Sequence, residues 1–183
     1  MRTIDKRVKV TRRSFLKSGA AAAGVTALAG GTVAIDANGA WAMTTQHLKP
    51  EAMVTLVRMA RDLYPHDRLG DAYYAKAVEP YDAKAGADAT LKQLIEQGVA
   101  ELNSLSQAKY AMPYAAVNEE DDRVALLRSI ETTPFFQKIR GDMVVALYNQ
   151  PAVWAKFGYE GSSAEHGGYL ERGFNDIDWL KDA

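Results

Sequence analysis

The spacing of apolar residues limits the fold more than any other feature of this sequence. Between residues 50 and 147, apolar side chains recur three and four positions apart in successive windows, which is the period of a helix with one buried face. In the same region no window alternates apolar and polar residues over the length of a strand, and no Asn-Gly or Asp-Gly turn separates β-branched runs. The pattern therefore predicts an all-α domain of about five helices.

Prolines and capping residues set the expected helix boundaries. Proline fits the first turn of a helix but ends a helix from inside, and Asp, Asn and Thr are favourable N-caps. The expected helices run from Pro50 to just before Pro65, from Asp71 to about Lys84 with a kink at Pro80, from an Asp88 cap to about Leu105, from an Asn118 cap to Ile130, and from a Thr133 cap to about Leu147. Gly98 is expected to mark close packing, and the core stripe of the last helix comprises Phe135, Phe136, Ile139, Met143, Val144 and Leu147.

The sequence changes character at Gln150. From there to Ala183 it is too rich in glycine for a helix and too rich in aromatic residues for a linker. Large aromatic side chains on an irregular segment have to be buried against the helical body or against another protein. We therefore interpret residues 150–183 as an irregular, partner-docking arm. The candidate partner-binding residues are Phe135, Phe136, Tyr148, Trp154, Tyr159, Tyr169, Phe174 and Trp179.

The first 42 residues have the three parts of an export signal: a basic start, an apolar stretch and a small-residue end. Within the basic start, Arg12-Arg13 followed by Phe15-Leu16-Lys17 resembles the twin-arginine signature. Ala40 and Ala42 place small residues where a signal peptidase reads the chain, which predicts cleavage after Ala42. The alternative is an uncleaved N-terminal anchor helix over residues 11–35. The expected domains are a signal peptide, residues 1–42, and a helical domain, residues 43–183.

This signal predicts a periplasmic protein that is a passenger of the twin-arginine translocase. That route carries folded cargo, including cargo already joined to a cofactor or a partner. The leader holds seven basic and two acidic residues, a balance of +5, so the whole-chain charge of −1 leaves −6 for residues 43–183. An acidic domain has no electrostatic reason to bind nucleic acid.

The sequence lacks the common motifs by which a protein binds a cofactor or a metal ion or catalyses a reaction by itself. The chain has no cysteine, which excludes disulfides, iron–sulfur clusters, thiolate metal sites and covalent c-type haem. It also lacks a dinucleotide fingerprint, a phosphate loop, a His-Glu-x-x-His motif and a Gly-x-Ser-x-Gly motif. The three histidines, His47, His66 and His166, are far apart in the sequence. We expect no catalytic, cofactor-binding or metal-binding residue in this chain.

Three segments that contain acidic residues could have a role in metal binding or catalysis, but a structural role is the simpler interpretation of each. Residues 119–122 are all acidic, but this suits the positive end of a helix dipole. Asp176 and Asp178 lie beside Trp179, where docking or capping is favoured. His66 and Asp67 occupy a polar turn that is expected to precede the next helix. The enzymatic alternative is a site around His66, Asp67 and Asp176.

The C-terminal half resembles the small subunit of gluconate 2-dehydrogenase-type complexes, often called the subunit 3 family. The matching segments are Thr133-Pro134-Phe135-Phe136, Leu147-Tyr148-Asn149-Gln150-Pro151 with Trp154, Gly158-Tyr159-Glu160-Gly161, Gly167-Gly168-Tyr169 and Gly173-Phe174-Asn175-Asp176. In the N-terminal half, residues 60–67 are similar to that family's first helix and following turn.

The resemblance implies a non-catalytic accessory subunit. In that family, a large flavin dehydrogenase of the glucose–methanol–choline (GMC) type holds FAD and oxidises a sugar, sugar acid or other alcohol, and a c-type cytochrome commonly takes the electrons. The small subunit helps the large subunit to fold and carries it across the membrane, where another subunit can hold the complex on the membrane. A further alternative for this chain is a free-standing periplasmic domain that binds a small ligand in its aromatic region.

Overall fold

The computed structural model describes residues 26–28, 32–35 and 41–170. From residue 45 to residue 170 the described chain contains helices and no strand, which confirms the predicted all-α domain. The elements of this region are α2 Pro50–Leu63, α3 Asp71–Val78, α4 Pro80–Ala87, α5 Ala89–Tyr110, η1 Tyr114–Ala116, α6 Glu120–Ser129, α7 Pro134–Tyr148, α8 Pro151–Phe157 and η2 Ser163–His166.

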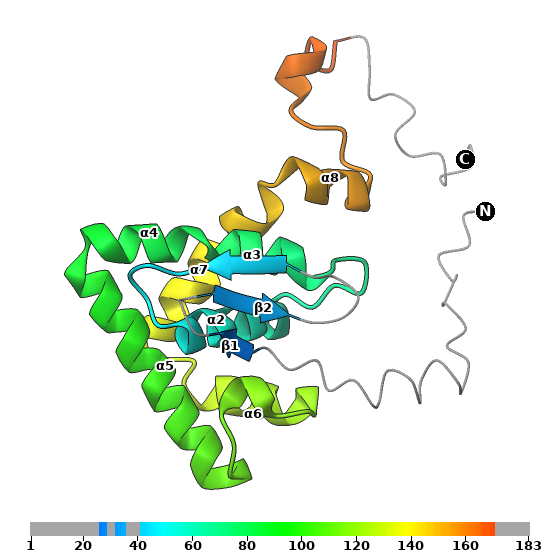
Figure 1. The fold of residues 1–183 in the computed structure, drawn as a ribbon. Coiled ribbons are helices and arrows are strands. Elements are labelled where there is room, and N and C mark those ends of the chain that lie inside the picture. The colour runs from blue at the N-terminus through cyan, green and yellow to red at the C-terminus, as the bar shows by residue number, and fades with distance from the viewer. Residues whose placement is uncertain (1–25, 29–31, 36–40, 171–183) are drawn as a thin grey trace.

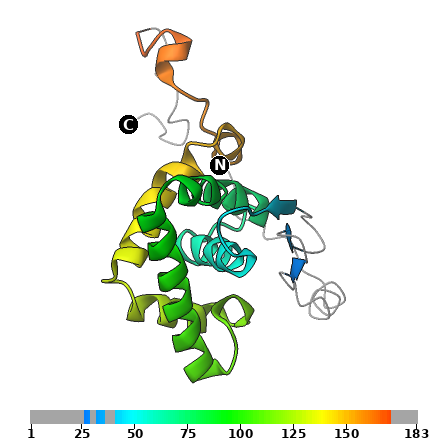
Figure 2. The same cartoon turned by 60° about the vertical axis from the view of Figure 1, so that its left-hand side comes forward.

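Helix α2 is the central element of the body. It contacts α3, α5, α6 and α7, and Figure 2 shows these four helices arranged around it. Residues on all of its sides are buried, from Ala52 through Met53, Leu56 and Val57 to Ala60. A helix with buried residues on all of its sides has to be enclosed by other elements of the fold. This enclosure places α2 at the centre of the hydrophobic core that the described residues form.

Local sequence signals account for several boundaries. The Asp88 side chain accepts hydrogen bonds from the backbone N–H groups of Thr90 and Leu91, and Thr133 accepts one from Phe136, as expected of N-caps. The expected kink at Pro80 is a break into two helices, α3 and α4. The prediction that Asn118 caps the next helix was wrong, because the N-cap of α6 is Glu119, and the Glu119 side chain makes no capping hydrogen bond.

Gly98 is a point of close packing, as predicted. A methyl group built on its Cα would lie 2.1 Å from Cγ of Phe135, so the Phe135 ring occupies the space that a side chain would take. This contact joins α5 to α7. With any residue other than glycine at position 98, α5 and α7 could approach each other this closely only if Phe135 moved.

The structure also contains elements that the sequence analysis missed. Residues 151–157 form helix α8, although an irregular arm was expected from Gln150 onward. Three short strands, β1 Thr26–Leu28, β2 Thr32–Ile35 and β3 Trp41–Thr44, form an antiparallel sheet that lies against α2 (Figure 1). In the register of this sheet, Ala42 is opposite Ala34. Cleavage after Ala42 would remove β1, β2 and the first two residues of β3.

Two buried carboxylates connect segments that are distant in the sequence. Asp62 of α2 binds Arg123 of α6 and the hydroxyl of Tyr114. Asp82 of α4 accepts hydrogen bonds from the backbone N–H groups of three consecutive residues, 46 to 48, at 2.8 to 3.0 Å. The second carboxylate therefore fixes the start of the helical domain to α4.

Candidate functional site

Helix α8 is the base of the C-terminal arm and is joined firmly to the end of α7. Val153 is fully buried, and the Trp154 indole N–H donates a 2.6 Å hydrogen bond to the carbonyl of Tyr148. The Gln150 side-chain amide donates to the carbonyls of Tyr73 and Ala146, at 3.0 and 2.9 Å. These contacts fix the first two turns of the arm on the helical body. Gly158, with φ of 74°, ends α8 in the left-handed conformation that glycine adopts readily.

An aromatic cluster lies where the arm meets the body. His66 Nε2 and the Tyr148 hydroxyl are 2.6 Å apart, and the rings of Tyr64 and Tyr148 meet edge to face with centroids 6.0 Å apart. Phe157 lies against His66, with 5.0 Å between ring centroids. Burial and, to a smaller extent, Tyr64 raise the pKa of Tyr148, so this hydroxyl stays protonated at neutral pH.

Beside the cluster is a shallow hollow of about 310 Å³, lined by residues 65–68 and Phe157. It brings together His66 and Asp67, two residues of the enzymatic alternative. The imidazole, however, is paired with Tyr148, and no described contact joins it to Asp67. The third residue, Asp176, lies outside the described residues. A neutral hydroxyl beside an imidazole can orient a polar group in the hollow.

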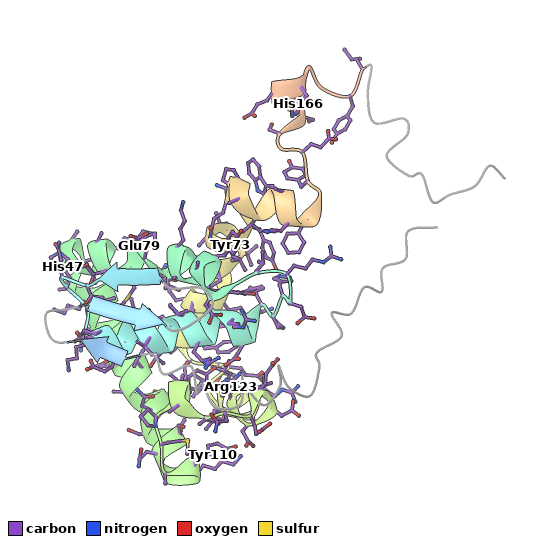
Figure 3. The ribbon with its side chains drawn as sticks, turned by 45° about the vertical axis from the view of Figure 1, so that its right-hand side comes forward. His47, Tyr73, Glu79, Tyr110, Arg123 and His166 are labelled. Atoms are coloured by element: carbon purple, nitrogen blue, oxygen red, sulfur yellow. The ribbon has the colours of Figure 1, made fainter. Side chains whose placement is uncertain are left out.

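Beyond α8, apolar side chains of the arm face solvent. Tyr159 packs its ring edge-on against Trp154 yet is 52% exposed, Tyr169 is 62% exposed and Leu170 is 88% exposed. Figures 1 and 2 show this part of the chain standing away from the helical body, and Figure 3 shows His166 at its far end. Exposed apolar groups gathered in one region are typical of a surface that another protein covers.

The predicted partner-binding residues have different positions in the structure. Tyr148 and Trp154 lie at the base of the arm, and Tyr159 and Tyr169 are exposed on it. Phe135 and Phe136 do not fit that role, because both are buried in the domain's own core. Phe174 and Trp179 lie outside the described residues, as do the export residues Arg12, Arg13, Phe15, Leu16 and Lys17 and the peptidase residue Ala40.

The sequence analysis missed three exposed residues of this region. Phe157 is 43% exposed and lines the hollow. Val144, assigned above to the core stripe of the last helix, faces solvent together with Val145. Adjacent residues of a helix point about 100° apart, so Val144 and Val145 cannot both share the buried stripe with Met143 and Leu147. The run of five consecutive apolar residues from Met143 to Leu147 was the available signal.

Within residues 41–170 no group of three or more His, Asp or Glu side chains is arranged to hold a metal ion. Three of the consecutive acidic residues, Glu120 to Asp122, form the first turn of α6. His47 lies over Gly86, and His166 Nε2 lies 3.2 Å from the carbonyl of Glu160. Each of the three histidines thus has a separate local environment.

Residues 9–29 match the family model of the TAT (twin-arginine translocation) pathway signal sequence. The match includes the paired arginines and the residues that follow them, so this protein is exported through the twin-arginine pathway to the periplasm. In the described part of the chain, no helix combines the length and apolar character needed to span a membrane. Searches of curated proteins and of solved structures gave no significant match.

Proposed function

We propose that this protein is the non-catalytic small subunit of a periplasmic, FAD-dependent dehydrogenase complex of the GMC type. Its partner would hold the FAD and oxidise a sugar, sugar acid or other alcohol, and a c-type cytochrome would take the electrons. The small subunit would assist folding of the flavoprotein and carry it through the twin-arginine translocase on its own signal.

The distribution of exposed apolar side chains carries this proposal. Four of the eight large hydrophobic residues that are exposed in the described structure lie on the arm, between residues 157 and 170. A protein that acts alone has no need to concentrate apolar surface on a projecting arm. Rigid aromatic groups are effective anchors at protein interfaces, where each can contribute a few kcal/mol. The family resemblance implies the kind of partner that this arm would bind.

The export signal gives the proposal its second part. Because the twin-arginine route accepts folded cargo, one signal can serve two chains that associate before export. Replacing Arg12 and Arg13 with Lys should then leave both this chain and the FAD-dependent dehydrogenase activity in the cytoplasm. Normal periplasmic dehydrogenase activity in that variant would contradict the escort role.

The arm itself can be tested without disturbing the core. Tyr159→Ser combined with Leu170→Ser should remove a larger FAD-containing chain from material purified through a tag on this protein. Leu105→Ser with Met112→Ser is the matched control, because these two exposed hydrophobics lie in the last turns of α5 and just beyond its end. Figure 3 shows that end of α5, marked by Tyr110, on the opposite side of the body from the arm. Purification of the unaltered protein as a flavin-free monomer would reject the proposed function.

A further inference from the structure

A groove of about 350 Å³ lies between α7 and the junction of α3 with α4. Its walls are mainly apolar, from Ala77 and Pro80 on one side to Val145 and Ala146 on the other. Val145 is 65% exposed, and its neighbour Val144 is also exposed. The surface is separate from the arm and lies on the helical body, where the backbone is fixed by core packing.

The polar groups within the groove are already paired, with one exception. The Tyr81 hydroxyl donates to Asp142 Oδ2 at 2.8 Å, and Lys138 Nζ lies 2.8 Å from the same oxygen. Burial favours a higher pKa for Asp142, but the bonds from Lys138 and Tyr81 outweigh it and lower the pKa. The carboxylate is therefore ionised and occupied.

Lys84 is the exception. It lines the same groove, and within residues 41–170 its ammonium group makes no ion pair and no hydrogen bond. Its charge acts through space on Asp142, whose pKa it helps to lower. The groove thus presents an apolar wall beside a positive charge that has no hydrogen-bonded partner among these residues. A carboxylate is the complementary group for this position.

Gly141 leaves open space along the α7 side of the groove. Glycine inside a helix costs about 1 kcal/mol relative to alanine. At Gly98 the ring of Phe135 explains the missing side chain, but a methyl group built on Gly141 meets no atom within 4 Å. Gly141 lines the groove, so the space above it is open to a group from another molecule.

We propose that this groove is a second docking site for the flavoprotein subunit, separate from the arm. The occupant is a segment of that subunit that inserts an aliphatic or aromatic side chain over Gly141 and places a carboxylate at Lys84. The inference rests on the proposed function, and it assigns a surface that neither the arm nor the export signal requires.

The chain contains no cysteine, so a single introduced thiol can report on the groove. In the purified complex, Val145→Cys should react with a maleimide about tenfold more slowly than in the free subunit, because an interface core excludes solvent. Leu105→Cys is the matched control and should react equally in both. Equal labelling of Val145→Cys in an intact complex would overturn the groove as a docking site while leaving the proposed function in place.

Point variants test the two specific contacts. Gly141→Trp should fill the groove and weaken flavoprotein binding by about tenfold or more, whereas Gly141→Ala should retain binding. Lys84→Glu should weaken binding more in low salt than in high salt, and Lys109→Glu, at the far end of α5, should not. Unchanged affinity in both Gly141→Trp and Lys84→Glu would reject the site.

If something other than the flavoprotein subunit occupies the groove, the labelling of Val145→Cys will give a different result. Protection of Val145→Cys in the free subunit that disappears when residues 171–183 are deleted would mean that the chain's own end covers the groove. Protection that depends on the concentration of the free subunit would mean that a second copy does. Either result would overturn the proposal. Failure of any flavoprotein to co-purify with the unaltered chain would reject the proposed function itself, and this outcome differs from all the others.

Discussion

Arg123 donates two parallel hydrogen bonds to the carboxylate of Asp62, from Nε to Oδ2 at 2.7 Å and from Nη2 to Oδ1 at 2.9 Å. Both side chains are almost fully buried, with relative exposures of 6% and 2%. The remaining guanidinium nitrogen donates to the carbonyls of Val117 and Asn118, and the Tyr114 hydroxyl donates to Oδ2 of Asp62. The pair therefore ties α2, the loop before α6 and α6 itself together.

Asp62→Asn should destabilise the protein by about 3–5 kcal/mol, because it leaves the Arg123 guanidinium buried without its counter-charge. Urea denaturation monitored by circular dichroism measures the change. Lys138→Gln is the control: it breaks a solvent-exposed pair with Asp142 and should cost at most about 1 kcal/mol. Equal losses in the two variants would show that the buried pair has no special role.

Two helical glycines should respond in opposite ways to the same substitution. Gly98→Ala should lower the free energy of unfolding by about 1–3 kcal/mol, because the new methyl group collides with Cγ and Cβ of Phe135, which lie close to the backbone and cannot swing aside. Gly141→Ala should raise it by about 0.5–1 kcal/mol, since the space is open and alanine is the better helix former. Thermal unfolding of both variants provides the comparison, and Gly98→Ala should cost less in a Phe135→Ala background, which lacks the Cγ atom of the closest contact.

The parts of this fold that the sequence predicted depend on neighbours in the chain. Asp88 and Thr133 cap helices through bonds to residues two or three positions away, so their roles can be read locally. Helix α8 was missed because the glycines from 158 onward dominated the composition of the segment. Gln150-Pro151 at its start and Gly158 at its end were nevertheless ordinary boundary signals. The Asn38-Gly39 pair between strands β2 and β3 was a hairpin signal that was left unused in the leader.

The parts that could not be predicted depend on distant contacts. Asp62 and Arg123 are 61 positions apart, and nothing near either residue indicates its partner. For the candidate site, residue type identified Tyr148, Trp154, Tyr159 and Tyr169 as surface candidates. The same criterion misplaced Phe135, because an aromatic residue on an amphipathic helix is buried or exposed according to what packs against that face.

Ala111→Gly should stabilise the protein by about 0.5–1 kcal/mol. Ala111 ends α5 with φ of 57°, the left-handed conformation in which a Cβ atom is unfavourable and glycine is not. A residue with a Cβ atom pays about 1–2 kcal/mol for this conformation. The expected gain is smaller than this cost, because glycine has greater freedom in the unfolded chain. A rise in melting temperature checks it, with Ala83→Gly, at an exposed site inside α4, expected to lower the melting temperature. A fall in both variants would contradict the argument.

Asp82 should make the start of the helical domain sensitive to acid. Burial favours a higher pKa for this carboxyl, but the hydrogen bonds from the N–H groups of Leu48, Gln46 and His47 outweigh burial and lower the pKa. A carboxyl whose pKa is lower in the folded state contributes stability that is present above its unfolded pKa, about 3.9, and is lost as the pH falls through the folded value.

The Asp82→Asn variant separates this contribution from that of other carboxyls. At pH 7 it should be less stable than the unaltered protein by about 1.5–3 kcal/mol, the range for hydrogen bonds to a charged group. The difference should be constant from pH 7 to about pH 5 and should shrink below about pH 4, where Asp82 itself becomes protonated in the unfolded chain. Amide hydrogen exchange at residues 46–48 is the direct measurement, because these three N–H groups lose their ionised acceptor in the variant. Protection of these amides that is unchanged in Asp82→Asn would show that another interaction fixes this segment to α4.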